Sequence, residues 1–327
     1  MATPLPRCLA LGEALLRLRV SAGQRLHDVH RFEVAVGGAE LNAMIAAAQT
    51  GIDTTFVTKL PVGPLGERVI RHARQHGVAV AGPRQPGGRL GTYYVEAGPA
   101  PRGTEVIYDR AGSAFAHLEP GELQLDALLG DVDHVHVTGI TFALGDGAAK
   151  AALALLEEAT NRDIPVSYDI NYRAKLWDLV QARASTQRVM EHVTTLFASP
   201  HDLTAFFDAD GDTTEAAARV REAFDLERVV VSEREAYGPG RTRCRVTIVG
   251  AHVDRSRWVE AEVIDPIGAG DALAGVALGE LLQGQAQEVA AARAVAAAAI
   301  QQTLLGDPLI VERDELSLPG IDRQVRR

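Results

Sequence analysis

The stretch IDPIGAGDALAGVAL, residues 264–278, joins a short β-branched run to an Ala/Leu-rich run that is typical of a helix. Gly268 and Gly270 lie at the junction, and Asp271 follows them at the start of the expected helix. A glycine-rich turn lets several backbone N–H groups point at one spot, where the helix dipole adds partial positive charge. The stretch therefore predicts an anion-binding turn between a strand and a helix, with a carboxylate beside it.

A carboxylate beside such a turn can accept a proton from a hydroxyl while the N–H groups stabilise charge on a transferring phosphoryl group. A simpler interpretation is a strand-to-helix turn in which Asp271 only stabilises the first helical turn. The stretch is not a Walker A loop, and Leu273 stands where a complete G-x-G-x-x-G motif needs its last glycine. Taken alone, the motif leaves both interpretations open.

Elsewhere, short β-branched runs alternate with longer segments of helical periodicity. This alternation predicts an α/β fold with a parallel sheet. We expect a first buried strand in residues 8–18 and further strands at 54–60, 134–140, 164–170, 194–200 and 228–233. The expected helices are 39–50, 65–76, 145–161, 180–192, 214–224, 270–283 and 286–305.

The region 88–110 differs from this pattern, because it contains two strands of alternating polarity around the turn-rich residues 98–103. Together with residues 14–36, these strands are expected to build a small sheet outside the main one. The sequence thus predicts one large core with a small β insert.

The composition limits the classes of function. Of 327 residues, 46% are hydrophobic and 23% charged, as in an ordinary folded protein. The formal net charge of −10 argues against a nucleic-acid-binding surface, because phosphate contacts need clustered Lys and Arg. A small anionic substrate remains compatible with this charge if a few arginines converge locally.

Cysteine usage and the apolar segments indicate a cytoplasmic protein without a membrane span. Cys8 and Cys244 lie far apart in the sequence, which indicates neither a disulfide framework nor a zinc site and fits a reducing cytoplasm. Charged residues interrupt the apolar run 8–18 before it reaches secretory length. The apolar segment 289–305 contains Arg293 and is too Ala-rich to predict a membrane span, so we expect a buried helix there and no membrane partner.

Polar residues at the ends of other predicted elements suggest ligand contacts. The segment GGAELN places Gly38 and Asn42 at the start of a helix, where a polyol can approach the backbone closely, although a simple turn and cap also fits. Asp169, Asn171 and Arg173 alternate from the end of a buried strand, where open α/β sheets bind ligands. A solvated strand exit is the alternative there.

The small sheet supplies two more candidates, Tyr108 and Arg110, in the segment IYDRAGSA at 107–114. Exposed strand residues would explain them equally well. An arginine fork pairs well with a carboxylate, so Arg110 and Arg173 together would suit an anionic sugar.

In combination, these segments resemble the ribokinase-like sugar kinases, the phosphofructokinase B family. VGGAELNAMIAAAQTG (36–51) is similar to the family's N-terminal sugar-binding signature, and DPIGAGDALAGVALGELL (265–282) to its catalytic signature. Segments GRLGTYYVE, YDRAGSAFA, HVTGIT and DINYRAKLW look most like those of 2-keto-3-deoxygluconate kinases. The resemblance covers nearly the whole chain and implies a three-layer α/β/α fold with a small β-sheet lid, formed by about 14–36 and 88–110.

The resemblance implies an ATP-dependent kinase that phosphorylates the terminal hydroxyl of a sugar acid, 2-keto-3-deoxygluconate above all. Asp271 matches the catalytic base, and Gly268, Ala269 and Gly270 match the anion hole. The substrate-binding residues it implies are Gly38, Asn42, Tyr93, Tyr108, Arg110, Asp169, Asn171 and Arg173. The nucleotide-binding residues it implies are Ser199, Ser232, Gly238, Gly268 and Gly270, with Asp202 acting indirectly on Mg²⁺ bound with ATP.

The chain departs from the family at three places. KLPVGPLGE (59–67) lacks the Asp or Asn often found before Pro-Leu-Gly, which removes an expected sugar contact. SPHD (199–202) stands where the family usually has Asn-x-x-Glu, which shortens the acid associated with Mg²⁺. The segment 232–238 is expected to form a turn near the nucleotide, but it carries extra charges and lacks an early glycine.

Alternative functions are a kinase for a neutral sugar such as ribose or fructose, a nucleoside kinase, or a kinase-derived sugar-binding protein that uses ATP weakly. The lid also offers a surface for a homodimer or a higher homo-oligomer.

Overall fold

The computed structural model describes residues 4–98 and 102–317, and its main feature is a 10-stranded sheet. Seven of its strands are parallel: β1 (Arg7–Leu11), β4 (Asp53–Val57), β6 (Val78–Ala81), β10 (His134–Thr138), β11 (Val166–Asp169), β12 (Thr195–Ala198) and β13 (Arg228–Ala236). Beyond β13 the sheet is antiparallel: β14 (Arg241–Val249) pairs with β13, β15 (Val253–Arg255) and β16 (Val259–Glu262). The spatial order is β15-β14-β13-β12-β11-β10-β1-β4-β6, with β16 beside β14.

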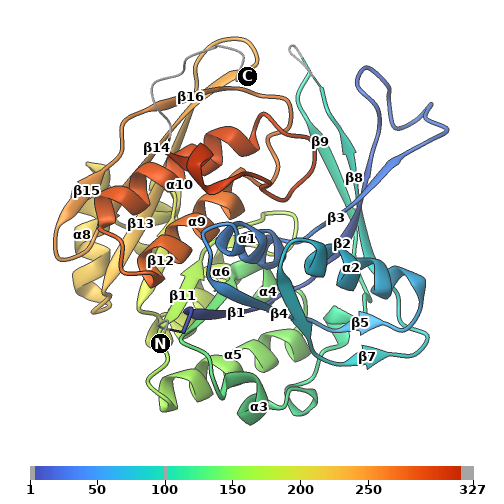
Figure 1. Cartoon of the computed structure of the whole chain (residues 1–327), viewed down its shortest axis with the longest axis horizontal. Coiled ribbons are helices and arrows are strands. Elements are labelled where there is room, and N and C mark those ends of the chain that lie inside the picture. Colours follow the sequence, from blue (N-terminus) through green and yellow to red (C-terminus); the bar gives the residue numbers. More distant parts are fainter. Residues whose placement is uncertain (1–3, 99–101, 318–327) are drawn as a thin grey trace.

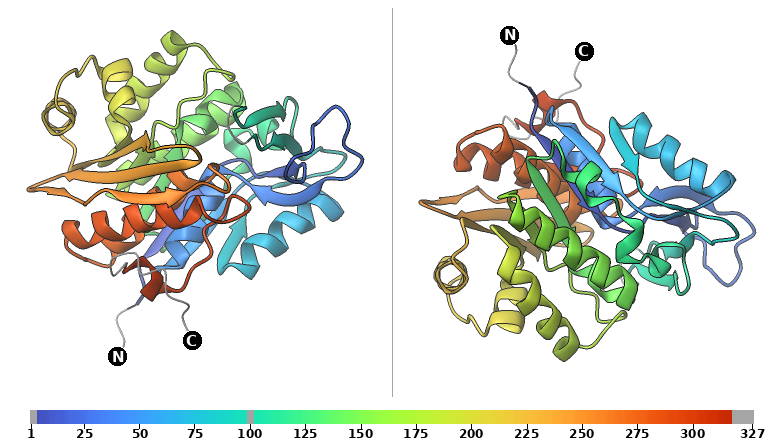
Figure 2. Two further views of the ribbon diagram at one scale, coloured as in Figure 1. Left: turned by 90° about the horizontal axis from the view of Figure 1, so that it is seen from above. Right: turned by 90° about the horizontal axis from the view of Figure 1, so that it is seen from below.

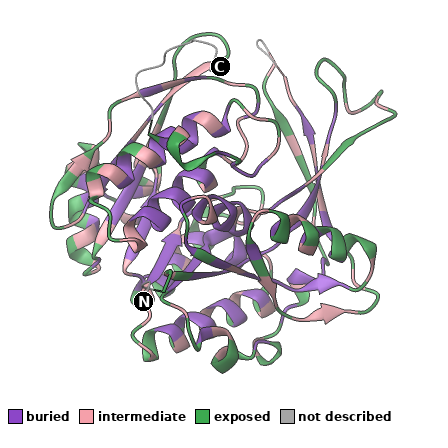
Figure 3. Ribbon diagram, in the orientation of Figure 1, coloured by how far each residue is buried: buried purple, intermediate pink, exposed green. Residues whose placement is uncertain are grey.

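Helices cover both faces of this sheet, and each face has its own apolar core (Figures 1 and 2). The helices that pack on one face are α3 (Leu125–Leu129), α4 (Gly139–Ala143), α5 (Asp146–Asn161), α6 (Leu179–Val189), α7 (Pro200–Phe207) and α8 (Thr213–Ala223). The helices that pack on the other face are α1 (Ala39–Ala48), α2 (Pro64–Gln75), α9 (Ala269–Leu282) and α10 (Gln287–Gln301). The central strands are buried, as expected of parallel strands covered on both faces (Figure 3). The predicted three-layer α/β/α fold is confirmed.

A separate four-stranded sheet stands beside the main one, in the order β3-β2-β8-β9. Its strands are β2 (Leu15–Arg19), β3 (Glu33–Gly37), β8 (Gly91–Glu96) and β9 (Glu105–Asp109). These ranges confirm the small sheet expected from residues 14–36 and 88–110; part of the turn expected at 98–103 lies outside the described residues. A two-stranded ladder, β5 (Leu60–Pro61) with β7 (Arg84–Gln85), lies nearby (Figure 1).

The prediction of one strand within residues 8–18 was wrong, because the segment contains parts of β1 and β2 in different sheets. Gly12 ends the first strand: its N–H donates to Val57 O at 3.1 Å, and a Cβ there would lie 2.2 Å from the Glu40 carboxylate. The chain therefore crosses from the main sheet to the small sheet within three residues.

Other predicted boundaries were also wrong, among them the ends of the strand expected at 134–140 and of the helix expected at 286–305. Residues 139 and 140 belong to α4, because the Thr138 hydroxyl caps that helix by accepting from Ile140 N at 3.2 Å. Residues 302–305 lie outside α10, and the carbonyl of Gln302 instead accepts N–H groups from Ile264 and Asp265 at 2.8 and 3.1 Å. The end of α10 thus supports the segment that leads into α9.

The turn expected at 232–238 was wrong as well, since β13 continues to Ala236 and the hairpin turn follows it. Cross-strand ion pairs explain the extension: Glu233 faces Arg245 at 2.7 Å, and Glu235 faces Arg243 at 2.6 Å. The extra charges in this segment therefore stabilise an extended hairpin.

Helices α1 and α9 pack closely through small residues, which fixes their N-terminal ends side by side. Gly275 is the tightest point, because a Cβ there would lie 2.1 Å from Ala43 O and 2.8 Å from the Ala46 methyl. A larger side chain at 275 has no room unless the helices separate.

We therefore predict that Gly275→Leu lowers the free energy of unfolding by at least about 1–3 kcal/mol, the usual cost of overpacking a core. Chemical denaturation followed by circular dichroism measures this. Lys150→Leu, which adds a leucine at an exposed position of α5, is the matched control and should change stability little. Equal stabilities of the two variants would contradict the close packing of α1 on α9.

Candidate active site

A cavity of about 800 Å³ opens where the carboxyl ends of the parallel strands meet the small sheet and the first turns of α1, α7 and α9. Almost all the residues predicted from the sequence line it. They are Gly38, Asn42, Tyr93, Tyr108, Arg110, Asp169, Asn171, Arg173, Ser199, Asp202, Ser232, Gly268, Ala269, Gly270 and Asp271. Gly238 does not line it: this residue is exposed in the turn after β13, so its nucleotide role stays a prediction.

The first turn of α9, residues 268–270, is open to the cavity; we call it the anion turn. Gly268 is the N-cap, with a φ of +87° that favours glycine, and no side chain caps the helix. A Cβ at Gly270 would meet no atom within 4 Å, so this side of the turn faces free space. The first N–H groups of the helix are therefore presented to the cavity, an arrangement that suits a phosphate.

Asp271 lies in the same turn and is only partly accessible. Its Oδ2 accepts a hydrogen bond from Asn42 Nδ2 at 2.8 Å, which links the first turns of α9 and α1. Burial raises the pKa of Asp271 to about 6, against the lowering effects of the Asn42 hydrogen bond and the Arg173 charge. The carboxylate is therefore a stronger base than an ordinary aspartate and is still ionised at neutral pH.

Asp169, at the end of β11, has a different proton affinity. Burial raises its pKa to about 8, with further contributions from the negative charges of Asp271 and Asp202. Its Oδ1 accepts the N–H of Asn171 at 3.1 Å, a turn in which Asn171 adopts a φ of +41°. At neutral pH a proton therefore stays on Asp169 and leaves Asp271 charged, a separation of roles typical of paired carboxylates in active sites.

The small sheet forms the opposite wall of the cavity. The rings of Tyr93 and Tyr108 stack with centroids 5.6 Å apart, and the Arg110 guanidinium lies 5.6 Å from the Tyr108 ring. Arg110 Nε donates to Glu13 Oε2 at 2.7 Å. Arg173 lies at the exposed rim, where its Nη1 donates to Tyr172 O at 3.2 Å.

Sequence reasoning missed Glu13, which is only 2% exposed and lines the cavity. Besides Arg110, it accepts the hydroxyl of Ser113. A signal was present, because Glu13 is a charged residue directly after a glycine in an otherwise apolar run. Its carboxylate holds the Arg110 guanidinium in place at the wall formed by the small sheet.

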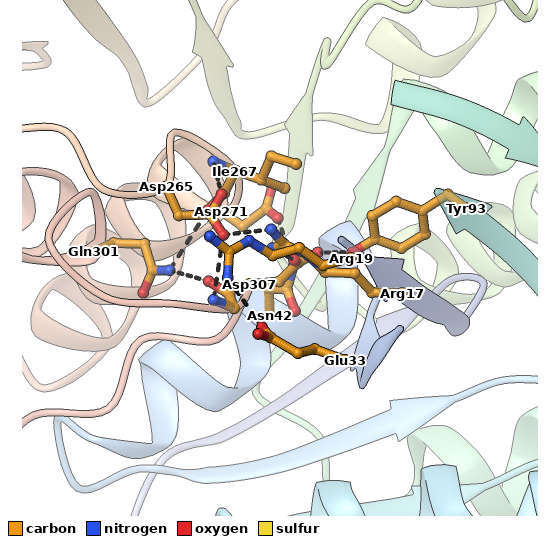
Figure 4. A network of polar contacts seen from close by, with 11 residues as sticks. Arg17, Arg19, Glu33, Asn42, Tyr93, Asp265, Ile267, Asp271, Gln301 and Asp307 are labelled. Atoms are coloured by element: carbon orange, nitrogen blue, oxygen red, sulfur yellow. Dashed lines mark hydrogen bonds and ion pairs between the residues drawn. The ribbon is translucent and has the colours of Figure 1, made fainter. Parts of the chain in front are cut away.

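A second group of missed residues lies behind the anion turn. Figure 4 shows Arg17 between Asp265 and Asp307, with the Tyr93 hydroxyl donating to Asp307. These carboxylates are far apart in the sequence, so only the fold brings them together. Glu40, also missed, is buried beside the cavity and accepts hydroxyls of Thr138 and Thr141 at 2.7 Å each.

Ser199 and Asp202 form a capping box at the start of α7. The Ser199 hydroxyl donates to Asp202 Oδ2 at 2.7 Å and accepts from Asp202 N at 3.1 Å. Across residues 4–98 and 102–317, no group of three or more His, Cys, Asp and Glu side chains can hold a metal ion. The indirect role of Asp202 toward Mg²⁺ stays a prediction, and its visible function is to cap a helix.

The remaining sequence signals are structural. His201 is exposed on the first turn of α7. Cys8 and Cys244 are buried free thiols. None of the helices in the described part of the chain has the length and apolar character needed to cross a membrane.

Residues 6–309 match the pfkB family carbohydrate kinases. This range includes nearly all the described residues. This chain belongs to that family. It is therefore a carbohydrate kinase, a phosphotransferase with an alcohol as acceptor, and the resemblance seen in its two signatures is confirmed.

Similar proteins cover the chain almost completely. It is 35% identical over 321 residues to the 2-dehydro-3-deoxygalactonokinase of Haloferax volcanii, covering 96% of this chain and 98% of that relative. It is 32% identical to the 2-dehydro-3-deoxygluconokinase of Thermoproteus tenax, with 91% and 89% covered. A crystal structure of the Thermotoga maritima 2-dehydro-3-deoxygluconokinase superposes with a TM-score of 0.89 at 29% identity, covering 96% and 97% of the chains.

The raised pKa of Asp271 predicts a stability change. Because the folded state holds this proton up to about pH 6, against an ordinary value of 3.8, ionisation destabilises the fold as the pH rises through that interval. Asp271→Asn should therefore be more stable than wild type at pH 8 by about 3 kcal/mol, with the gain shrinking toward pH 4.

Thermal unfolding at several pH values measures this difference. Asp146→Asn, which removes the acidic residue from the exposed first turn of α5, is the matched control and should show no such gain. A pH-independent difference between wild type and Asp271→Asn would contradict the raised proton affinity.

Proposed function

We propose that this chain is an ATP-dependent kinase that phosphorylates the terminal hydroxyl of a 2-dehydro-3-deoxy sugar acid. The observation that carries the proposal is the position of Asp271, an ionised carboxylate in the open first turn of α9, inside a cavity whose opposite wall presents Arg110. The names of the most similar relatives, which are kinases of 2-dehydro-3-deoxy sugar acids, support the substrate class.

In this proposal Asp271 is the general base. It takes the proton from the terminal hydroxyl as that oxygen attacks the γ-phosphate of ATP, while Asn42 orients the carboxylate. The N–H groups of the anion turn stabilise the negative charge on the transferring phosphoryl group. Mg²⁺ bound with ATP would neutralise charge on the phosphates, and Asp202 is the side chain proposed to act on it indirectly.

The sugar would lie between Asp271 and the small sheet. Gly38 and Asn42 are proposed to contact its hydroxyls, and Asp169 and Asn171 its other oxygens. Its carboxylate would meet Arg110 and Arg173. Because Glu13 already balances the charge of one of these guanidiniums, the two arginines offer about one net positive charge to one substrate carboxylate.

The nucleotide would occupy the other end of the cavity, near Ser199 and Ser232. β13 and β14 form this wall, and their paired charges, such as Glu233 with Arg245, hold it as an extended hairpin. The charges in segment 232–238 are thus engaged with each other. We propose that this hairpin edge takes the place of the turn expected beside the nucleotide.

We further propose that the small sheet acts as a lid that excludes water during transfer, within one kinase domain. Its exposed apolar side chains, Phe32, Val34 and Ile107, offer a surface for a homodimer. A cytoplasmic location, inferred from cysteine usage, remains part of the same proposal.

The substrate class is tested with a panel of sugars and sugar acids in a coupled assay of ADP release. We predict turnover of 2-keto-3-deoxygluconate, of its C4 epimer 2-keto-3-deoxygalactonate, or of both, and much slower turnover of ribose, fructose and nucleosides. Arg110→Met and Arg173→Met should each raise KM for the sugar acid at least about tenfold, because each removes a charge-assisted contact.

Arg89→Met is the matched control, since Arg89 is an exposed arginine that pairs with Asp109 outside the cavity. A preference for a neutral sugar, with wild-type KM in both Arg110 and Arg173 variants, would replace the proposed substrate with a neutral one.

The role of Asp271 is tested by Asp271→Asn, which should lower kcat by about 10²–10⁴-fold, the usual cost of losing a positioned general base. The wild-type kcat/KM should fall as the pH drops through about 6, because protonated Asp271 cannot accept the hydroxyl proton. Asn42→Ala removes a hydrogen bond that favours the ionised carboxylate and so raises the pKa of Asp271. The fall of kcat/KM should therefore begin at a higher pH in this variant. An effect of Asp271→Asn on KM alone would rule out the base assignment.

A further inference from the structure

Arg17 is a fully buried arginine that the proposed chemistry leaves unexplained. Its side chain is 1% exposed and comes from β2, the strand of the small sheet that follows the crossing from the main sheet. Nη1 pairs with Asp307 and Nη2 with Asp265, two carboxylates that are themselves buried (Figure 4). One cation thus bridges two acids from segments before and after α9 and α10.

Both acids support the anion turn. Asp265 Oδ1 accepts the N–H of Ile267 at 3.2 Å, and its Oδ2 accepts the N–H of Gly306 at 3.3 Å. Asp307 packs directly against the N-cap, because a Cβ on Gly268 would lie 2.1 Å from the Asp307 carbonyl oxygen. Both acids therefore contact the backbone segment that presents the N–H groups.

The small sheet makes two further contacts with the segments that carry Asp265 and Asp307. The Tyr93 hydroxyl, from β8, donates to the Asp307 carboxylate. Ile267 packs against the apolar cluster of Leu15, Tyr93 and Val95 in the small sheet. The sheet and the anion turn are therefore joined by an ion triad, a hydroxyl and an apolar contact.

Arg17 does not line the cavity, so it has no direct contact with a substrate there. A buried ion triad is also a weak source of stability, because desolvation offsets most of the attraction between the charges. Its main effect here is geometric, since the planar guanidinium fork fixes two carboxylates at once.

We infer that Arg17 is a positioning residue for phosphoryl transfer: from the small sheet it holds Asp265 and Asp307 and so fixes the anion turn relative to the sugar-binding wall. The inference rests on the function proposed above for the anion turn. The alignment of the N–H groups with the transferring phosphoryl group thereby depends on the seating of the small sheet.

The test compares Arg17→Met with wild type, using whichever sugar the wild type phosphorylates fastest. We expect kcat to fall about 10²-fold, as when one donor of an anion hole is lost, and KM for the sugar to change less than about threefold. Arg17→Lys keeps the charge but cannot bridge both acids, so an intermediate kcat is expected.

Arg19→Met is the matched control. Arg19 lies on the same strand and is also buried, but it pairs with Glu33 inside the small sheet at 3.0 Å. This variant should keep the wild-type kcat. Guanidinium added well below denaturing concentrations should restore part of the kcat of Arg17→Met, and sodium at equal ionic strength should not, because only guanidinium reproduces the fork.

Two results would overturn the inference: a folded Arg17→Met protein with kcat within about twofold of wild type, or a loss confined to KM. Near-ultraviolet circular dichroism and thermal unfolding establish that the variant is folded. If Arg17→Met does not fold, Arg17→Lys and Asp307→Asn replace it, and each is expected to lower kcat without changing KM. An unchanged kcat in both variants overturns the inference. Turnover of only a neutral sugar would refute the proposed substrate and leave this test intact.

Discussion

The architecture around the cavity depends on an uncapped helix N-terminus, the first turn of α9. Within the described residues no side chain caps its leading N–H groups, and the glycines at 268 and 270 keep the backbone both bent and accessible. Such a terminus costs stability unless an anion occupies it, because unpaired N–H groups lose hydrogen bonds that a cap would supply. The close packing of α9 on α1 holds this costly end in place and brings Asn42 to Asp271.

The same packing also sets the proton affinities at the site. Burial raises the pKa of both Asp169 and Asp271; the negative charges of Asp271 and Asp202 raise that of Asp169 further, whereas the hydrogen bond from Asn42 on α1 lowers that of Asp271. One carboxyl is therefore left neutral and the other ionised at the same pH. The cavity thus holds an ionised carboxylate beside a neutral carboxyl, as the proposed roles of Asp271 and Asp169 require.

Local sequence could predict the anion turn and its Asp271, since Gly-Ala-Gly-Asp between a strand and a helix determines that geometry within a few residues. It could also predict the alternation of strands and helices. It could not predict Glu13 beside Arg110, or Arg17 between Asp265 and Asp307, because those contacts join segments that only the completed fold brings together. The continuation of β13 was missed for a related reason, as Glu233 needs its partner on β14 to favour a strand over a turn.

The fold explains why charged residues interrupt the apolar run near the N-terminus. Buried charges in a strand cost free energy unless each finds a partner, so a strand serving only as core would carry apolar residues instead. Glu13 pairs with Arg110 at the wall proposed to face the sugar, and Arg17 pairs with two acids behind the anion turn. A segment of five residues therefore connects the small sheet to both reacting ends of the cavity, which makes its polarity a requirement of the site rather than of the core.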